Sequence, residues 1–161
     1  MNLSPHFTLA EAMASHAAVR LGIDNTPPDE LIAALRYVAI NVLEPIRTHY
    51  GVPLVYDGRN SWYRCPALNA ALPGAAANSQ HVKGEAVDIE VPGISNIELA
   101  RFVRDHLKFD ELGLENYDSR EGPQSGWVHV GASAGFRGQR DIWTYDARRP
   151  NGQRYTPGLA S

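Results

Sequence analysis

The segment Ser79-Gln-His-Val-Lys-Gly-Glu-Ala-Val-Asp88 joins a polar turn to a β-strand and carries one histidine, His81, and one aspartate, Asp88. In the segment 85–91, Val87, Ile89 and Val91 alternate with other residues, which is typical of a strand with one buried face. Alternation places Asp88 on the opposite face, where an unpaired carboxylate costs desolvation free energy. A metal ion is a suitable partner for it, and Gly84 lets the chain bend between His81 and the strand. The segment therefore predicts part of a metal site.

A second strand-like segment, Trp127-Val-His-Val130, has a histidine in its middle. If the two strands are neighbours with their valine faces buried together, Asp88 and His129 meet on the open face, and His81 approaches from the turn. Two imidazoles and one carboxylate make a three-ligand zinc site with an open position, which is the catalytic form of zinc site. The alternative is that all three are ordinary surface or core residues, which requires three polar side chains to fall together by chance.

The bulk composition limits the classes of protein that fit. The chain has 161 residues, of which 43% are hydrophobic and 20% charged, so we expect one soluble domain over 1–161, with 135–161 as a C-terminal strand and tail. The net charge of −3 argues against nucleic-acid binding, and no apolar run is long enough to span a membrane. A single cysteine, Cys65, excludes an intramolecular disulfide. We expect a monomer.

Hydrophobic periodicity predicts helices first and strands later. The pattern favours an α+β fold in which N-terminal helices pack on a small, mainly antiparallel sheet that carries the zinc site. Pro45 is expected to kink or loosen the last turn of its helix. The expected helices cover about 8–20, 26–50, 66–72 and 96–107, with Asn96 as the cap of the last; the expected strands cover 54–56, 85–91, 111–115, 127–131 and 140–145; the remaining tail should fold back over the surface or fray.

These motifs together resemble a known family. Ser79-x-His81-x-x-Gly84-x-Ala86-x-Asp88 followed by Trp127-x-His129 is similar to the zinc D-Ala-D-Ala carboxypeptidase and peptidoglycan endopeptidase family, which includes phage endolysins and D-Ala-D-Ala dipeptidases. The segment 61–69 looks like that family's Ser-Gly-Tyr-Arg segment, and 3–11 and 42–47 are similar to members of phage and prophage origin. The resemblance implies a hedgehog/D-Ala-D-Ala peptidase-like fold.

The same resemblance implies roles for individual residues. His81, Asp88 and His129 would bind zinc, and Arg64 would hold the substrate carboxylate or the oxyanion of the transition state, a role that suits a permanently charged planar guanidinium. Ser79 would hydrogen-bond the substrate or orient the ligand loop. The alternatives are that Arg64 is a surface arginine and that Ser79 only forms the turn.

One position departs from the family pattern. Many members place the catalytic acid three residues before the last histidine, where this chain has Gly126. A general base is still required, and Glu115 is our choice, because it would lie beside Trp127 if 111–115 pairs with 127–131. Asp118 and Glu121, in the following loop, are the reserves. The alternative for Glu115 is a solvated charge at a strand end.

The predicted function is zinc-dependent hydrolysis of peptide bonds in the stem peptide or cross-link of bacterial peptidoglycan, as a phage or prophage endolysin. One alternative is a D-Ala-D-Ala carboxypeptidase or dipeptidase acting on free precursor peptides. Another is a catalytically inactive, zinc-stabilised binding module, which Gly126 favours. The N-terminal residues have neither a basic start nor an apolar core, so we expect synthesis in the host cytoplasm without a signal peptide and release to the cell wall through a separate pore.

Overall fold

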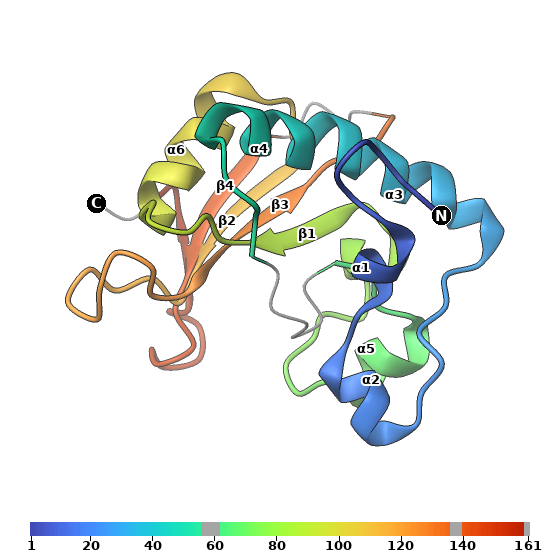
Figure 1. The fold of residues 1–161 in the computed structure, drawn as a ribbon. Helices are drawn as coiled ribbons and strands as arrows, with labels where there is room; N and C mark the ends of the chain where they lie inside the picture. The colour runs from blue at the N-terminus through green and yellow to red at the C-terminus, as the bar shows by residue number, and fades with distance from the viewer. Residues whose placement is uncertain (56–61, 136–139, 160–161) are drawn as a thin grey trace.

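The central element of the fold is a five-stranded sheet with the strand order β1-β3-β2-β4-β5 (Figure 1). The structure is a computed structural model that describes residues 1–55, 62–135 and 140–159. Strands β2 and β4 run parallel, and the other neighbouring pairs are antiparallel, so the predicted α+β fold with a mainly antiparallel sheet is confirmed. The strands are β1 (Ala86–Ile89), β2 (Glu111–Glu115), β3 (Trp127–Gly131), β4 (Asp141–Tyr145) and β5 (Tyr155–Pro157).

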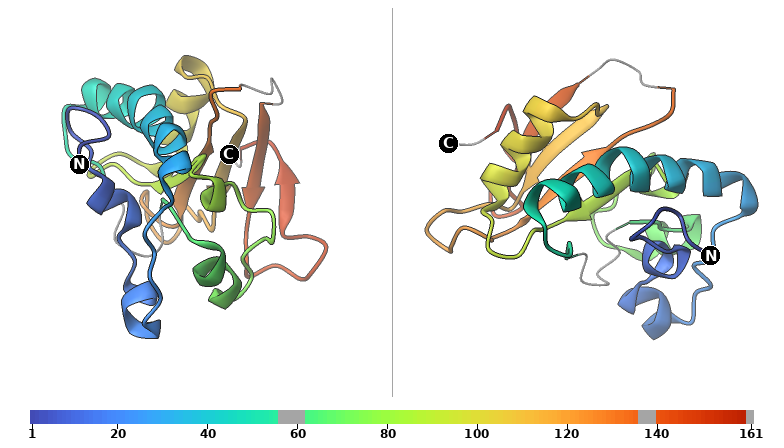
Figure 2. Two further views of the ribbon diagram at one scale, coloured as in Figure 1. Left: turned by 90° about the vertical axis from the view of Figure 1, so that its right-hand side faces the viewer. Right: turned by 45° about the horizontal axis from the view of Figure 1, so that its top comes forward.

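The helices divide into two groups around this sheet. One long helix, formed by α3, η2 and α4, lies with α6 across one face, whereas α1, α2 and α5 gather near β1 (Figures 1 and 2). The α-helices are α1 (Leu9–Met13), α2 (His16–Leu21), α3 (Ile32–Val38), α4 (Glu44–Tyr50), α5 (Pro66–Ala71) and α6 (Asn96–His106), with 3₁₀ turns η1 (Asp29–Leu31) and η3 (Gln80–Lys83) and a π-helical turn η2 (Ala39–Leu43). Among the described residues, no helix is both long and apolar enough to cross a membrane.

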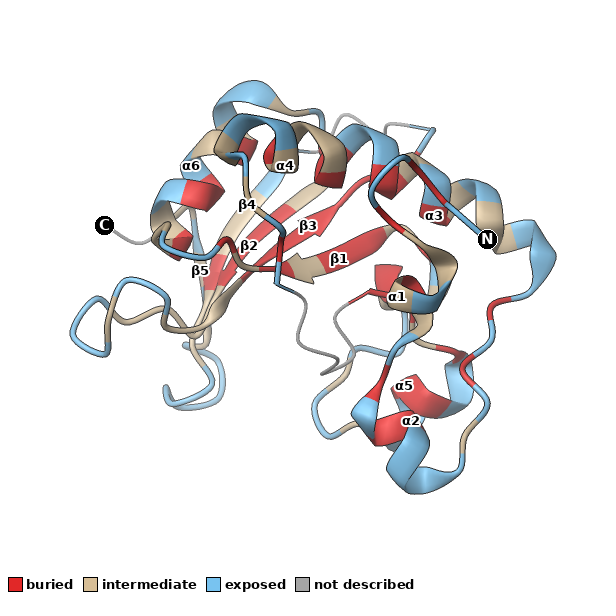
Figure 3. Cartoon of the chain, in the orientation of Figure 1, coloured by how far each residue is buried: buried red, intermediate tan, exposed pale blue. Residues whose placement is uncertain are grey.

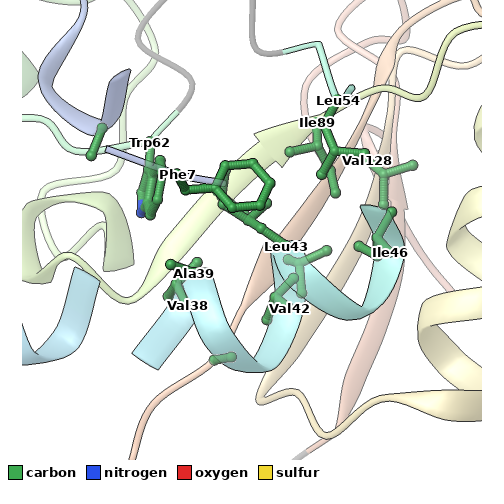
Figure 4. Packing of buried hydrophobic residues seen from close by; sticks show 14 of the residues in the cluster. Phe7, Val38, Ala39, Val42, Leu43, Ile46, Leu54, Trp62, Ile89 and Val128 are labelled. Atoms are coloured by element: carbon green, nitrogen blue, oxygen red, sulfur yellow. The ribbon is translucent and has the colours of Figure 1, made fainter. Parts of the chain in front are cut away.

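The core lies between the long helix, α6 and the valine-rich face of the sheet. Val42 and Ile46 of the helix pack toward Ile89 of β1 and Val128 of β3, and all four are buried (Figure 4). Figure 3 shows that the buried residues lie along the central strands and on the sides of the helices that face the sheet. The apolar side chains of β1 and β3 therefore point into the core, and their polar side chains must point to the opposite face of the sheet.

The N-terminal helix is shorter than predicted. The predicted capping box is present, with the Thr8 side chain accepting from the Glu11 amide and the Glu11 carboxylate accepting from the Thr8 amide. The chain then leaves helical geometry at Ala14, and Ser15 caps a second helix by accepting from the Ala18 amide. The prediction of one helix over 8–20 is wrong, because Ser15 is a strong N-cap that starts a new helix within it.

Pro45 distorts its helix at a different place from the one predicted. The last turn of α4 is regular up to Gly51, which ends the helix with a positive φ of 69°. The distortion is the π-helical turn η2, which lies on the N-terminal side of the proline. A proline ring lacks an N–H and collides with the carbonyl four residues earlier, so its effect falls on the preceding turn rather than the following one.

The remaining elements follow the predictions closely, with three differences. The predicted strand 54–56 is a single bridge in which Val55 exchanges two backbone hydrogen bonds with Glu90; Tyr56 lies outside the described residues. Ser95, rather than Asn96, caps α6. The predicted C-terminal tail contains an additional strand, because Tyr155–Pro157 pairs with β4 as β5.

Candidate metal centre and substrate cleft

Asp88 and His129 lie side by side on the open face of the sheet. Strands β1 and β3 are paired antiparallel, and in this register Asp88 lies opposite His129 and Val87 lies opposite Val130. The prediction that the two strands are neighbours is confirmed. The His129 Nδ1 atom lies 2.8 Å from the Asp88 Oδ1 atom. Directly opposed residues in an antiparallel pair have the closest side chains, so this register alone brings the carboxylate and the imidazole into contact.

His81 reaches the same carboxylate from the turn that precedes β1. It lies in η3, whose N-cap is Ser79, and its Nε2 atom is 3.4 Å from the Asp88 Oδ1 atom. Its Nδ1 atom is 2.7 Å from the backbone carbonyl oxygen of Trp62, to which it donates when protonated there. That hydrogen bond leaves the Nε2 lone pair facing Asp88 and fixes the orientation of the ring, as is common for metal-binding histidines. No pattern in the sequence indicates that the Trp62 carbonyl oxygen has this role.

The three side chains fit a metal ion of zinc size. Their donor atoms all lie within 4.8 Å of one another. Ligand atoms around a tetrahedral zinc ion, at bond lengths of about 2.0–2.1 Å, are separated by about 3.3–3.4 Å, so only small side-chain movements are needed. Two imidazoles and one carboxylate are also a donor set that zinc accepts. The cluster His81–Asp88–His129 can therefore hold a metal and leave one coordination position open.

The protonation of the cluster is set by burial and by the contacts within it. Burial alone would raise the pKa of Asp88, but the two adjacent imidazoles outweigh burial and hold its pKa below the ordinary value. Burial lowers the pKa of His81, which favours the neutral ring that a metal requires. For His129 burial acts in the same direction, but the contact with Asp88 outweighs it and raises the pKa.

The cluster opens into a cleft of about 550 Å³. Arg64 and Ser79 line it, and the Arg64 Nη2 atom donates to the Ser79 Oγ atom at 3.2 Å. The Ser79 hydroxyl also accepts from the His81 amide, so it orders both the arginine and the ligand turn. Burial lowers the pKa of Arg64, although Asp88 and Glu115 oppose this, and the guanidinium remains charged. Of the segment 61–69, Ser61 lies outside the described residues.

Glu115 lines the same cleft. Strands β2 and β3 pair with Glu115 opposite Trp127 and Gly113 opposite His129, as expected for the long-looped hairpin. Burial raises the pKa of Glu115 to about 7, and the negative charge of Asp88 adds to that effect. A carboxyl group with a pKa near neutrality suits a general base.

The two reserve carboxylates lie away from the cleft lining. Asp118 binds the Arg120 guanidinium through both carboxylate oxygens, and these hydrogen bonds hold its pKa well below the ordinary value. Glu121 is 60% exposed and pairs with Arg148. The structure therefore brings only Glu115, of the three candidates, together with the metal cluster.

Gly126 has a structural reason for lacking a side chain. Its φ of +68° is in the left-handed region, and a Cβ atom there would lie 1.9 Å from the Glu115 carbonyl oxygen. The Asn96 side-chain Nδ2 atom also donates to the Gly126 carbonyl oxygen at 3.0 Å, which holds this turn against α6. A side chain at position 126, and therefore an acid there, is sterically excluded. The atom nearest to the added Cβ is the backbone carbonyl oxygen of Glu115.

Gly126→Ala should destabilise the fold by more than about 2 kcal/mol, because it combines left-handed backbone strain with the collision at Glu115. Gly22→Ala is the matched control, since Gly22 has a φ of +65° and open space around a Cβ atom. Thermal denaturation should show a clearly larger loss for Gly126→Ala than for Gly22→Ala. Equal losses would mean that the close approach to Glu115 has no energetic consequence.

Trp143 and Glu111 also belong to the cleft, and sequence reasoning did not identify them. The Trp143 ring lies 5.6 Å from the His129 ring, at an interplanar angle of 32°. The feature of the sequence that could have indicated the position of Trp143 is Gly113, because a glycine inside a strand often marks the close approach of another group. Here that group is the Trp143 indole.

The fold and the site define an α+β protein whose cleft contains a His-Asp-His cluster that could hold a metal ion. A family model for Peptidase M15 matches residues 5–131, and the chain belongs to this family. Membership makes the chain a metallopeptidase, and the predicted family resemblance is confirmed. A comparison with curated proteins finds no match.

Proposed function

We propose that the chain is a zinc-dependent peptidase that hydrolyses peptide bonds in the stem peptide or cross-link of bacterial peptidoglycan, and that it acts as a phage or prophage endolysin. The observation that carries this proposal is the His81–Asp88–His129 cluster, whose donor atoms lie within 4.8 Å of one another in the cleft that Glu115 also lines. Membership of the Peptidase M15 family supports the reaction type.

Each side chain of the cleft has a chemical task in this reaction. Zinc, when bound, supplies a Lewis acid that polarises the scissile carbonyl and acidifies the attacking water. Glu115 accepts the proton from that water and passes it to the leaving amine. Arg64, held by Ser79, donates hydrogen bonds to the oxygen that gains negative charge, and its permanent charge makes it suitable for that position.

A carboxypeptidase is the second candidate, and Arg64 is the residue that favours it. A guanidinium beside the metal cluster can pair with the terminal carboxylate of a short peptide as well as with an oxyanion. In contrast, an inactive binding module loses its main support, because Glu115 lines the cleft although position 126 has no acid. Products distinguish the two peptidases: a carboxypeptidase releases a terminal amino acid, and an endopeptidase releases larger fragments.

Removal of the metal should abolish hydrolysis, and zinc should restore it. The experiment incubates purified peptidoglycan with the protein as prepared, after chelator treatment, and after zinc is returned, and measures newly formed amino groups. Magnesium should not restore activity, because two imidazole ligands suit zinc and not magnesium. Full activity in the chelated, metal-free protein would contradict the proposal.

The rate of hydrolysis should fall at low pH, because a protonated Glu115 cannot accept a proton. Burial raises the pKa of Glu115 to about 7, and a bound zinc ion would lower it from there, so kcat/KM should decline with a midpoint between about pH 5 and pH 7. The measurement is a pH–rate profile with the zinc content checked at each pH. A constant kcat/KM from about pH 7 down to about pH 5 with zinc still bound would contradict the assignment.

The resemblance of residues 3–11 and 42–47 to phage members of the family supports the proposed endolysin role. In this proposal the chain is made in the host cytoplasm and reaches the wall through a separate membrane pore. Cytoplasmic expression should leave bacteria intact until a pore-forming protein is expressed with it, whereupon the cells should lyse. Lysis that depends on the pore but not on Asp88 would contradict the proposal.

A further inference from the structure

The C-terminal hairpin β4–β5 lies outside the residues matched by the family model, yet it forms one wall of the cleft. Trp143 and Tyr145 of β4 pair with Gly113 and Glu115 of β2, so these two aromatic side chains share the open face of the sheet with the metal cluster. Tyr155 of β5 pairs with Tyr145 and also lines the cleft. The family motif therefore does not account for this wall.

Gly113 determines where the Trp143 side chain lies. A Cβ atom on Gly113 would be 2.2 Å from the indole ring, so the indole occupies the space above this glycine. From there it lies beside the His129 ring, and the Tyr155 ring meets it edge-on at a centroid distance of 5.4 Å. Tyr155 is 66% exposed. Two aromatic groups that remain open to a ligand thus adjoin the metal cluster.

Glu111 supplies a negative charge, unpaired among the described residues, to the cleft that these rings also line. It lies two residues before Gly113 on the same face of β2, is half-buried, and lines the cleft. In the described part of the chain it has no hydrogen-bond or ion-pair partner, although its charge acts on both His129 and Tyr155. The described cleft lining contains three carboxylates, those of Asp88, Glu111 and Glu115, and one guanidinium, that of Arg64.

We propose that Glu111, Trp143 and Tyr155 form a subsite for a primary ammonium group on the substrate peptide, such as the side-chain amine of a diamino acid. Aromatic faces attract cations, and a carboxylate beside them adds a charged hydrogen-bond acceptor. Arg64 and His81 lie toward β1, whereas Trp143 and Tyr155 lie on the far side of His129, toward β4 and β5. The cleft thereby receives negative groups of the peptide at Arg64 and a positive group at the hairpin. This inference rests on the proposed peptidase function.

The test compares two stem peptides that differ only in whether the diamino acid has a free or an acetylated side-chain amine. Their affinities are measured by titration calorimetry with the zinc-loaded Glu115→Gln protein, in which hydrolysis is suppressed. The free-amine peptide should bind at least about tenfold more tightly. Adding Glu111→Gln should remove that preference and leave the affinity for the acetylated peptide unchanged, and adding Tyr155→Leu should reduce the preference. Adding Glu121→Gln, outside the cleft lining, is the matched control and should preserve it.

Equal affinity for the two peptides, no binding of either, or a preference that survives Glu111→Gln would overturn the subsite. Hydrolysis of the free-amine peptide by the zinc-loaded wild-type protein is measured separately. Selective binding without hydrolysis of any stem peptide supports the subsite and overturns the peptidase function, whereas hydrolysis without selectivity does the reverse. The two proposals therefore fail in different ways.

Discussion

Asp88→Ala should remove the metal and with it the activity. Asp88 Oδ1 is the atom that both imidazoles approach, at 3.4 Å for His81 Nε2 and 2.8 Å for His129 Nδ1. Its loss would leave the metal with two neutral imidazole ligands and no anionic one. Because loss of a group that only supports a ligand already weakens metal binding about 10–100-fold, loss of the ligand itself should exceed about 100-fold. The zinc content after dialysis, measured by metal analysis, should fall from about one zinc per chain to below about a tenth of that value.

The control for this variant is an aspartate outside the cleft. Asp105 is exposed and pairs with its neighbour Arg104, so Asp105→Ala should keep full zinc content and activity. Circular dichroism shows whether Asp88→Ala retains the fold. A folded Asp88→Ala protein that still binds one zinc per chain would show that the metal is held elsewhere.

Glu115→Gln should lower kcat by about 10²–10⁴-fold while the zinc content stays the same. The amide has nearly the same shape as the carboxylate but cannot accept the proton, so the substitution removes the base without emptying the cleft. Glu115 is also not a member of the metal cluster, which is why zinc should be retained. Steady-state kinetics and metal analysis on the same preparation check both parts of this result.

Asp118→Asn and Glu121→Gln are the controls for the base assignment. Both carboxylates form ion pairs, Asp118 with Arg120 and Glu121 with Arg148, and neither residue lines the cleft. Their substitution should change kcat less than about threefold, far below the effect expected for a general base. The assignment is wrong if Glu115→Gln keeps full activity and one of these two variants loses it.

The relative positions of Asp88 and His129 could be predicted because strand periodicity is a local property. Alternation of valines with other residues placed Asp88 and His129 on the faces opposite the core, and a single assumption about pairing brought them together. The same alternation placed Glu115 in the cleft. The capping box at Thr8 was equally readable, because its two hydrogen bonds join residues three positions apart.

The wall formed by β4 and β5 could not be predicted, because it depends on contacts between distant segments. Strand β4 pairs in parallel with β2, and no short turn signals such a pairing. Trp143 therefore gave no sign that it would lie beside His129. The hydrogen bond from His81 to the Trp62 carbonyl oxygen was equally inaccessible, since any residue can offer a backbone carbonyl.

Mass spectrometry of peptidoglycan fragments tests the central claim most directly. Purified peptidoglycan is incubated with the zinc-loaded protein and, in parallel, with the Asp88→Ala variant, and the soluble fragments are then identified. We expect the wild-type protein to release fragments with new amino and carboxyl ends at one type of peptide bond in the stem or cross-link, and Asp88→Ala to release none. Fragments with intact peptides, or the same peptide cleavage by both proteins, would contradict a metal-dependent peptidase centred on His81, Asp88 and His129.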